Sequence, residues 1–219
     1  MKKYVLFDLD GTLTDPALGI TNGIMHMLKK TGREVPPREE LYFFIGPPLI
    51  PSFMSVFGMT EEEAKQGLVY YREYFSEIGI FENEPYPGIK DALGKIRDAG
   101  LTVGVATSKP EEFAEKILVH FGLREYFDTV SGATMDEKRS TKADVIEYAL
   151  GRMGASSENT VMVGDRHHDV DGAKAFGIPT VGVLWGYGSQ KELEDAGAKW
   201  IVSSMDEMVS AIIGGCQDN

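Results

Sequence analysis

The stretch 4–13 constrains the fold more than any other part of the chain. Its apolar and aromatic residues from Tyr4 to Phe7 are typical of a strand that is buried on both faces of a parallel sheet. The strand then ends in two carboxylates, Asp8 and Asp10, followed by glycine and threonine. Two like charges this close repel each other and raise each other's pKa unless a cation lies between them. The pattern therefore favours a bound hard cation such as Mg²⁺, while an acidic strand-to-helix turn with a capping aspartate remains the alternative.

The composition is that of a folded protein rather than a disordered one. The chain has 219 residues, of which 42% are hydrophobic and 26% charged, enough for one large domain or for one domain with an insert. The formal net charge of −12 disfavours nucleic acid as a partner, because a polyanion would be repelled. A small phosphorylated substrate is compatible with this charge, since a bound metal ion reverses the sign of the field locally.

The same composition bears on the compartment. The single cysteine, Cys216, allows no intrachain disulfide, which is consistent with a reducing cytoplasm. No apolar run reaches the ~18–20 residues of a membrane span, and the run after Lys2 and Lys3 is too short for a signal peptide. We therefore expect a cytoplasmic protein that has no membrane partner.

Residues 15–87 read as an inserted helical domain. Apolar residues recur at helical spacing from Ile20 to Leu28, and a second helical stretch is expected over 39–45. The sequence 60–63 has the form of a capping box, and its helix is expected to carry apolar residues as far as Ile78. Proline-bearing links at Pro16 and over 85–88 enclose this block.

From residue 88 onward, helices and strands alternate. Strands are expected over 101–106, 127–131, 160–163, 180–183 and 200–202, with helical patterns between several of them and after the last. Alternation of this kind predicts an α/β core, a doubly wound parallel sheet with helices on both faces. The expected core domain is 1–14 together with 88–219.

Chemistry-bearing residues follow three of the expected strands. The strands end in Asp8 and Asp10, in Thr107 and Ser108, and in Asp165 with Asp169; Lys142 opens a helix. Open α/β sheets bind ligands at the carboxyl edge, so these side chains are expected to converge there. Together they would supply oxygens for Mg²⁺, donors for phosphate oxygens, and one cation, which is the set that phosphoryl transfer requires.

Other interpretations stay open at this point. Thr107 is also a residue type that caps helices, and Lys142 is also compatible with a solvated surface lysine. Asp171 competes with Asp169, because either could cap a helix. The pair His167 and His168 is interpreted as part of a loop rather than as a transition-metal site, since adjacent residues on one element do not normally share a metal and the other ligands are hard oxygens.

In these motifs the chain resembles the haloacid dehalogenase superfamily phosphatases that carry a helical cap. The matching stretches are 8–12, 107–108, Lys142, and 164–165 with Asp169, and they occur in the family's order along the whole chain. The overall run is similar to the phosphoglycolate phosphatase branch. The stretches 46–49, 164–169 and 182–188 resemble members described as 5′-nucleotidases.

The resemblance implies a role for each matched residue. Asp8 would attack phosphorus and become an aspartyl phosphate, and Asp10 would act as the general acid and base. Mg²⁺ would be held by Asp8, the backbone carbonyl of Asp10 and Asp165, with Asp169 close by or acting through water. Thr107, Ser108 and Lys142 would bind the phosphoryl group.

The resemblance also implies a role for the helical insert and leaves activities to choose between. The cap loop Gly46, Pro47, Pro48 and Leu49 would contribute specificity for a small phosphorylated metabolite, such as a nucleoside 5′-monophosphate or phosphoglycolate. A sugar phosphomutase of the same superfamily is the alternative enzyme. A non-catalytic phospholigand-binding or regulatory module is the alternative of another class.

Overall fold

The computed structural model describes residues 3–214, so Cys216 lies outside the described residues. The chain divides into two compact units, which we call the core unit (residues 3–15 and 85–214) and the helical unit (Pro16–Glu84). The boundaries expected from the sequence were 15 and 87. Two-residue strands, β2 (Thr14–Asp15) and β3 (Glu84–Pro85), stand where the chain leaves the core unit and returns to it.

The core unit contains a parallel six-stranded sheet with the order β5-β4-β1-β6-β7-β8. Its strands are β1 (Tyr4–Phe7), β4 (Thr102–Pro110), β5 (Thr129–Ala133), β6 (Thr160–Gly164), β7 (Thr180–Val183) and β8 (Trp200–Val202). The β1 strand lies at the centre, with Leu6 opposite Gly104 of β4 on one side and opposite Met162 of β6 on the other. The strand order reverses at β1, which makes the carboxyl ends of β1, β4 and β6 the expected ligand-binding edge.

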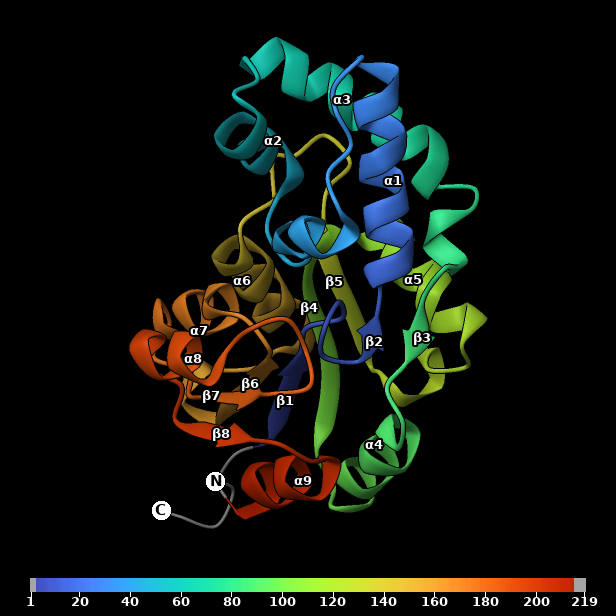
Figure 1. Ribbon diagram of the computed structural model, residues 1–219. Coiled ribbons are helices and arrows are strands. Elements are labelled where there is room, and N and C mark those ends of the chain that lie inside the picture. Colours follow the sequence, from blue (N-terminus) through green and yellow to red (C-terminus); the bar gives the residue numbers. More distant parts are fainter. Residues whose placement is uncertain (1–2, 215–219) are drawn as a thin grey trace. The chain divides into compact units, whose positions relative to one another are not determined.

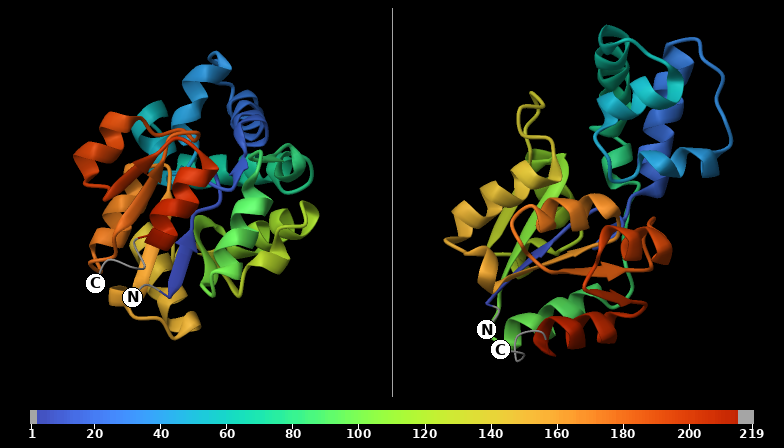
Figure 2. Two further views of the ribbon diagram at one scale, coloured as in Figure 1. Left: turned by 90° about the horizontal axis from the view of Figure 1, so that it is seen from below. Right: turned by 90° about the vertical axis from the view of Figure 1, so that its left-hand side faces the viewer.

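Helices cover both faces of this sheet (Figures 1 and 2). On one face, α6 and α7 bury an apolar cluster in which Leu6, Met162 and Ile146 take part. The opposite face is covered by α5 and α9, and α4 packs against α9. The bounds are α4 (Ile89–Asp98), α5 (Glu111–His120), α6 (Lys142–Met153), α7 (His167–Lys174), α8 (Gln190–Ala196) and α9 (Met205–Gly214), with 3₁₀ turns η3 (Arg124–Tyr126) and η4 (Ser157–Asn159). The predicted doubly wound α/β fold is confirmed.

The helical unit is built around a pair of packed helices, α1 (Ala17–Lys30) and α3 (Glu61–Phe75). The predicted capping box at Thr60 is confirmed, because its side chain accepts from the Glu63 backbone N–H and the Glu63 carboxylate accepts from the Thr60 backbone N–H. Three further elements complete the unit: η1 (Arg38–Phe44), α2 (Leu49–Phe57) and η2 (Gly79–Phe81).

The helical unit differs from the sequence-based prediction in three places. The stretch expected to be helical over 39–45 is a 3₁₀ helix, η1. The helix α2 was not among the predicted elements; it contains Pro51, and proline is compatible with the first turn of a helix, where its missing N–H is not needed. The helix α3 ends at Phe75, so Ile78 lies beyond it with an exposed side chain. Within residues 3–214, no helix combines the length and the apolar character needed to cross a membrane.

Candidate active site

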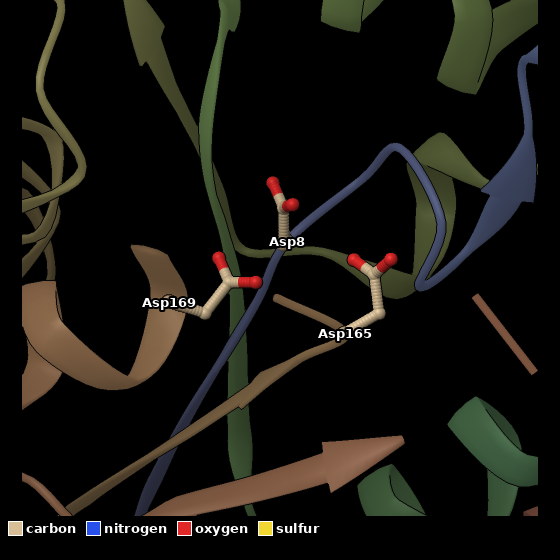
Figure 3. Close-up of side chains that lie close together, drawn as sticks. All are labelled: Asp8, Asp165 and Asp169. Carbon is tan, nitrogen blue, oxygen red and sulfur yellow. The ribbon is translucent and has the colours of Figure 1, made fainter. Parts of the chain in front are cut away.

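Three buried carboxylates meet at the carboxyl edge of the sheet. Asp8 directly follows β1, Asp165 directly follows β6, and Asp169 lies in the first turn of α7. One carboxylate oxygen from each lies within 4.8 Å of the others, and Figure 3 shows the three groups gathered around one space. Because carboxylate oxygens are hard ligands, this set is suited to a divalent cation such as Mg²⁺.

Lys142 completes this cluster from a fourth element. It is the first residue of α6, and the capping box made by Thr141 fixes the start of that helix. The buried Nζ lies 2.7 Å from Asp8 Oδ1 and 2.8 Å from Asp169 Oδ1, and donates to the Ala106 carbonyl at 3.2 Å. Burial alone would lower the pKa of Lys142, but the two carboxylates outweigh it and raise that pKa, so the lysine stays charged. Lys142 is therefore not a solvated surface lysine.

Asp10 forms an ion pair that the sequence analysis missed. Lys109 Nζ lies 2.8 Å from Asp10 Oδ2, and both side chains are buried. The other oxygen, Asp10 Oδ1, is buried with no hydrogen-bond donor among residues 3–214. Burial raises the pKa of Asp10 while Lys109 opposes that rise. A basic residue directly after Thr107 and Ser108, at the same strand end, was the available signal.

Thr107 and Ser108 lie within β4, which continues to Pro110 beyond the expected end of the strand. The buried Thr107 hydroxyl accepts from the Lys109 backbone N–H at 3.2 Å. It does not cap α5, whose N-cap is Pro110. The pairing of β4 with β5 shifts register between Thr107 and Pro110, which locally re-aims the side chains there.

Asp165 is held from both sides. Thr12 donates to its Oδ1 at 3.4 Å, and the Tyr187 backbone N–H donates to its Oδ2 at 2.7 Å. Burial and the nearby carboxylates of Asp169 and Asp8 raise the pKa of Asp165 well above its usual value. In the absence of a cation, the carboxyl group therefore gains from holding a proton.

The structure distinguishes between the two competing aspartates of α7. Asp169 is buried, whereas Asp171 is exposed. Asp169 also accepts from the Arg166 backbone N–H at 3.1 Å, and a Cβ on Gly164 would lie 2.2 Å from its carboxyl carbon. Burial raises the pKa of Asp169 to about 6 against the opposing effect of Lys142.

Among the described residues, neither His167 nor His168 belongs to a group of side chains that could hold a metal ion. The Nδ1 of His167 lies 2.8 Å from Glu192 Oε1, which also accepts from Arg166 Nε at 2.9 Å. Burial, aided by His167 and Arg166, lowers the pKa of His168 to about 4, so its ring is neutral at pH 7. These contacts fix the start of α7 and thereby the place of Asp169.

The four residues of the proposed specificity loop lie in the helical unit. Gly46 has a φ of 105°, a conformation that favours glycine, and Pro48 is the N-cap of α2. Leu49 begins that helix. The loop therefore has a defined backbone of its own, while its role in specificity stays a prediction.

Two glycines of the segment 184–189 lie against Asp165. A Cβ on Gly186 would lie 2.3 Å from the Gly11 carbonyl oxygen, and a Cβ on Gly188 would lie 1.8 Å from the Asp165 carbonyl oxygen. The glycine-rich pattern of this segment predicted that Gly186 and Gly188 serve backbone geometry next to the active site. Their close approach to Asp165 agrees with that prediction.

We expect Gly188→Ala to destabilise the protein and to lower its activity, because the new methyl group displaces the backbone of Asp165. Overpacking of this kind costs about 1–3 kcal/mol, which urea unfolding would measure. Gly94→Ala in α4 is the control. Apart from the chain neighbours and the backbone of α4 itself, no heavy atom of residues 3–214 lies within 4 Å of its Cβ position, so this change should stabilise the helix by up to about 1 kcal/mol. Equal stability of Gly188→Ala and the unmutated protein would contradict the close approach.

Comparison with known proteins agrees with this architecture. Residues 5–183 match the family described as haloacid dehalogenase-like hydrolase. The chain belongs to this family, as the sequence motifs indicated. A crystal structure of a predicted phosphatase from Clostridium acetobutylicum superimposes with a TM-score of 0.96 at 46% identity, covering 98% of this chain and 99% of that one.

Two curated relatives differ in their names. A 5′-nucleotidase from Pseudomonas aeruginosa is 41% identical over 189 residues, which are 86% of each chain. The tyrosine-protein kinase PtkA from Mycobacterium tuberculosis is 40% identical over 212 residues, covering 96% of this chain and 72% of its own. Several other relatives are named phosphatases, and we place this chain among the phosphatases of the family.

Proposed function

We propose that the protein is a Mg²⁺-dependent phosphomonoesterase that acts on a small soluble phosphate ester through an aspartyl-phosphate intermediate on Asp8. The observation that carries the proposal is the position of the Asp8 carboxylate. It is buried at the end of β1, 2.7 Å from the Lys142 ammonium group, and shares a cluster with Asp165. A nucleoside 5′-monophosphate is the first substrate to test, because of the relative named 5′-nucleotidase; phosphoglycolate is the second.

The charges of the site support a divalent cation. Two buried lysines face the buried carboxylates of four aspartates: Asp8, Asp10, Asp165 and Asp169. With all six groups ionised, two negative charges stay uncompensated in a buried place, which is costly. One Mg²⁺ would balance them. Asp8, Asp165 and the Asp10 backbone carbonyl would hold it, and Asp169, already bound to Lys142, would act close by or through water. When bound, the ion would neutralise charge on the phosphoryl oxygens.

The residues then divide the reaction between them. Asp8 attacks phosphorus in line, an Asp8 O–P bond forms, and the P–O bond to the ester breaks. Asp10, with its Oδ1 buried beside the nucleophile's strand end, gives a proton to the leaving alkoxide. It then takes a proton from the water that attacks phosphorus, which restores the Asp8 carboxylate and releases phosphate. Lys142 and the Thr107 and Ser108 groups bind the phosphoryl oxygens.

A lid that opens and closes over the site would control when the Asp8 phosphate forms and when water hydrolyses it. We assign that role to the helical unit, with the loop 46–49 contributing specificity. Pro16 and Pro85 lie at its two connections, where the fixed φ of proline limits the paths that the chain can take.

A substrate panel tests this function. The full chain is incubated with about 50–100 phosphomonoesters and Mg²⁺, and again with EDTA, and phosphate release is measured. We expect turnover of a nucleoside 5′-monophosphate or of phosphoglycolate, lost with EDTA. Transfer of phosphate to a sugar acceptor rather than to water would favour the phosphomutase. Tyrosine phosphorylation from ATP, with no ester hydrolysed, would favour the activity for which the kinase relative is named.

We expect the affinity for Mg²⁺ to fall as the pH falls. Because burial raises the pKa of Asp165 and brings that of Asp169 to about 6, protons occupy these groups more at low pH and compete with the cation. The Mg²⁺ concentration for half-maximal activity should rise below pH ~6 by up to about tenfold per pH unit for each proton that the cation must displace. The Mg²⁺-induced rise in Tm should shrink in parallel and be absent in Asp165→Asn. An unchanged Mg²⁺ requirement between pH ~7.5 and ~5.5 would contradict the predicted competition between protons and Mg²⁺.

A further inference from the structure

The segment Trp185–Gly188, which we call the clamp loop, contacts Asp165 through its backbone and a neighbouring part of the core through its side chains. Its Tyr187 N–H donates to Asp165 Oδ2 at 2.7 Å. The hydroxyl of the same residue donates to Asp15 Oδ1. One residue therefore joins the carboxylate of the metal cluster to the last core residue before the helical unit.

Further contacts hold the clamp loop on the loop that follows Asp8. The Trp185 indole N–H donates to the Thr12 carbonyl at 3.1 Å, and Thr12 in turn donates to Asp165. The Trp185 ring also packs edge-on against Tyr86, with 6.4 Å between centroids. Gly186 and Gly188 lack the side chains that would push the loop away from Asp165.

The two bonds of Tyr187 have different consequences. The backbone N–H donates to Oδ2 of Asp165 and so fixes the rotation of that carboxyl group. The phenol lies at the far end of a rigid ring, so its bond to Asp15 restrains the backbone that carries the N–H. Removing the hydroxyl leaves every direct contact of Asp165 in place but releases this restraint.

The geometry points to Tyr187 as a positioning residue for the divalent cation, acting on Asp165 through its hydroxyl bond to Asp15. This inference rests on the proposed Mg²⁺ site. Partners that orient a metal ligand without touching the metal commonly affect metal affinity by about 10–100-fold. The two printed bonds of Tyr187 go to a proposed metal ligand and to Asp15, so its effect should appear in cation binding before it appears in the chemical step.

The test measures cation binding directly. Mn²⁺, which accepts the same hard oxygen ligands, is titrated into the full chain without substrate, and bound ion is followed by water-proton relaxation. We expect Tyr187→Phe to weaken binding about tenfold, with Tm in EDTA unchanged. With substrate, the Mg²⁺ concentration for half-maximal activity should rise by a similar factor, while kcat at saturating Mg²⁺ stays within about twofold.

Variants of the partner residue make the assignment specific. Asp15→Ala should match Tyr187→Phe, whereas Asp15→Asn keeps an acceptor and should bind nearly as well as the unmutated protein. The double variant Tyr187→Phe/Asp15→Ala should be no weaker than either single change, because both remove the same bond. Tyr148→Phe is the control, since the contacts of Tyr148 with Arg139 and Arg152 are made by its ring.

Three results would overturn the inference, and they are distinguishable. If the unmutated protein binds Mn²⁺ and Tyr187→Phe binds it equally well, Tyr187 does not position the ligand and the proposed metal site stands. If the unmutated protein does not bind Mn²⁺ at millimolar concentration, the metal site itself is wrong and the inference ends with it. Additive losses in the double variant would also count against the shared bond.

Discussion

Asp8→Asn is expected to abolish phosphate release, with kcat/KM falling by about 10³-fold or more. The amide is nearly the same size as the carboxylate but is a poor nucleophile, and it cannot form the acyl phosphate. The change also removes the charge partner of Lys142 on one side, while Asp169 keeps its bond to Lys142 at 2.8 Å. The fold should therefore persist.

The measurement compares hydrolysis rates of the best ester with Mg²⁺ present, together with acid-quench trapping of the phosphorylated chain. Phosphoprotein should form in the unmutated chain and be absent in Asp8→Asn. Asp171→Asn is the matched control, because Asp171 is an exposed aspartate of α7; its rate should stay within about twofold. Equal rates in Asp8→Asn and the unmutated chain would remove the nucleophile assignment.

Lys142→Met is expected to affect both stability and activity. The ammonium group lies 2.7 Å from Asp8 and 2.8 Å from Asp169, so its loss leaves two buried carboxylates without their cation. Removing one partner of a buried ion pair costs about 3–5 kcal/mol. Phosphoryl binding would lose a charged donor, which we expect to lower kcat/KM by about 10²–10³-fold.

The pH dependence separates this cause from a simple packing loss. Burial already brings the pKa of Asp169 to about 6, and loss of Lys142 raises it further. A group with a raised pKa in the folded protein binds protons more tightly there than in the unfolded chain, so lowering the pH through that pKa stabilises the folded variant. The stability deficit should therefore shrink from pH ~7.5 to ~5.5.

Urea unfolding in EDTA at the two pH values measures this deficit. Lys174→Met is the control, since Lys174 is an exposed lysine at the end of α7; it should change stability by less than about 0.5 kcal/mol. A deficit that is the same at both pH values would indicate lost packing of the lysine stem rather than uncompensated charge.

The sequence predicted the parallel sheet and its chemistry-bearing edge, because buried parallel strands leave continuous apolar runs and their ends are marked by polar residues. It did not predict the bond between Lys109 and Asp10, because that contact joins the ends of two strands whose pairing, β1 with β4, is set by tertiary structure. The contacts of Tyr187 with Asp165 and Asp15 were also not predicted. A tyrosine between two glycines carries no local sign that its amide meets Asp165.

The helical unit was harder to predict than the sheet. The stretch 46–49 was interpreted as a loop, and no helix was predicted over α2, which begins at Leu49 and tolerates Pro51 because proline is compatible with the first turn of a helix. Around Arg38 the chain tightens into a 3₁₀ helix, which apolar spacing alone does not distinguish from an α-helix. The ends and the type of such helices depend on packing against other elements, and the sequence of one helix alone does not show that packing.

The way the core unit closes behind its insertion has a consequence for the evolution of the family. On the core side, the Tyr86 backbone N–H donates to the Leu13 carbonyl at 3.1 Å, so the two ends of the inserted block are joined independently of what lies between them. A block of different length or sequence can therefore replace residues 16–84 without rebuilding the sheet, as insertions at closely spaced ends generally permit. If the helical unit sets substrate choice as proposed, catalytic machinery and selectivity can be inherited separately, and chimaeras that exchange this block should change the preferred substrate.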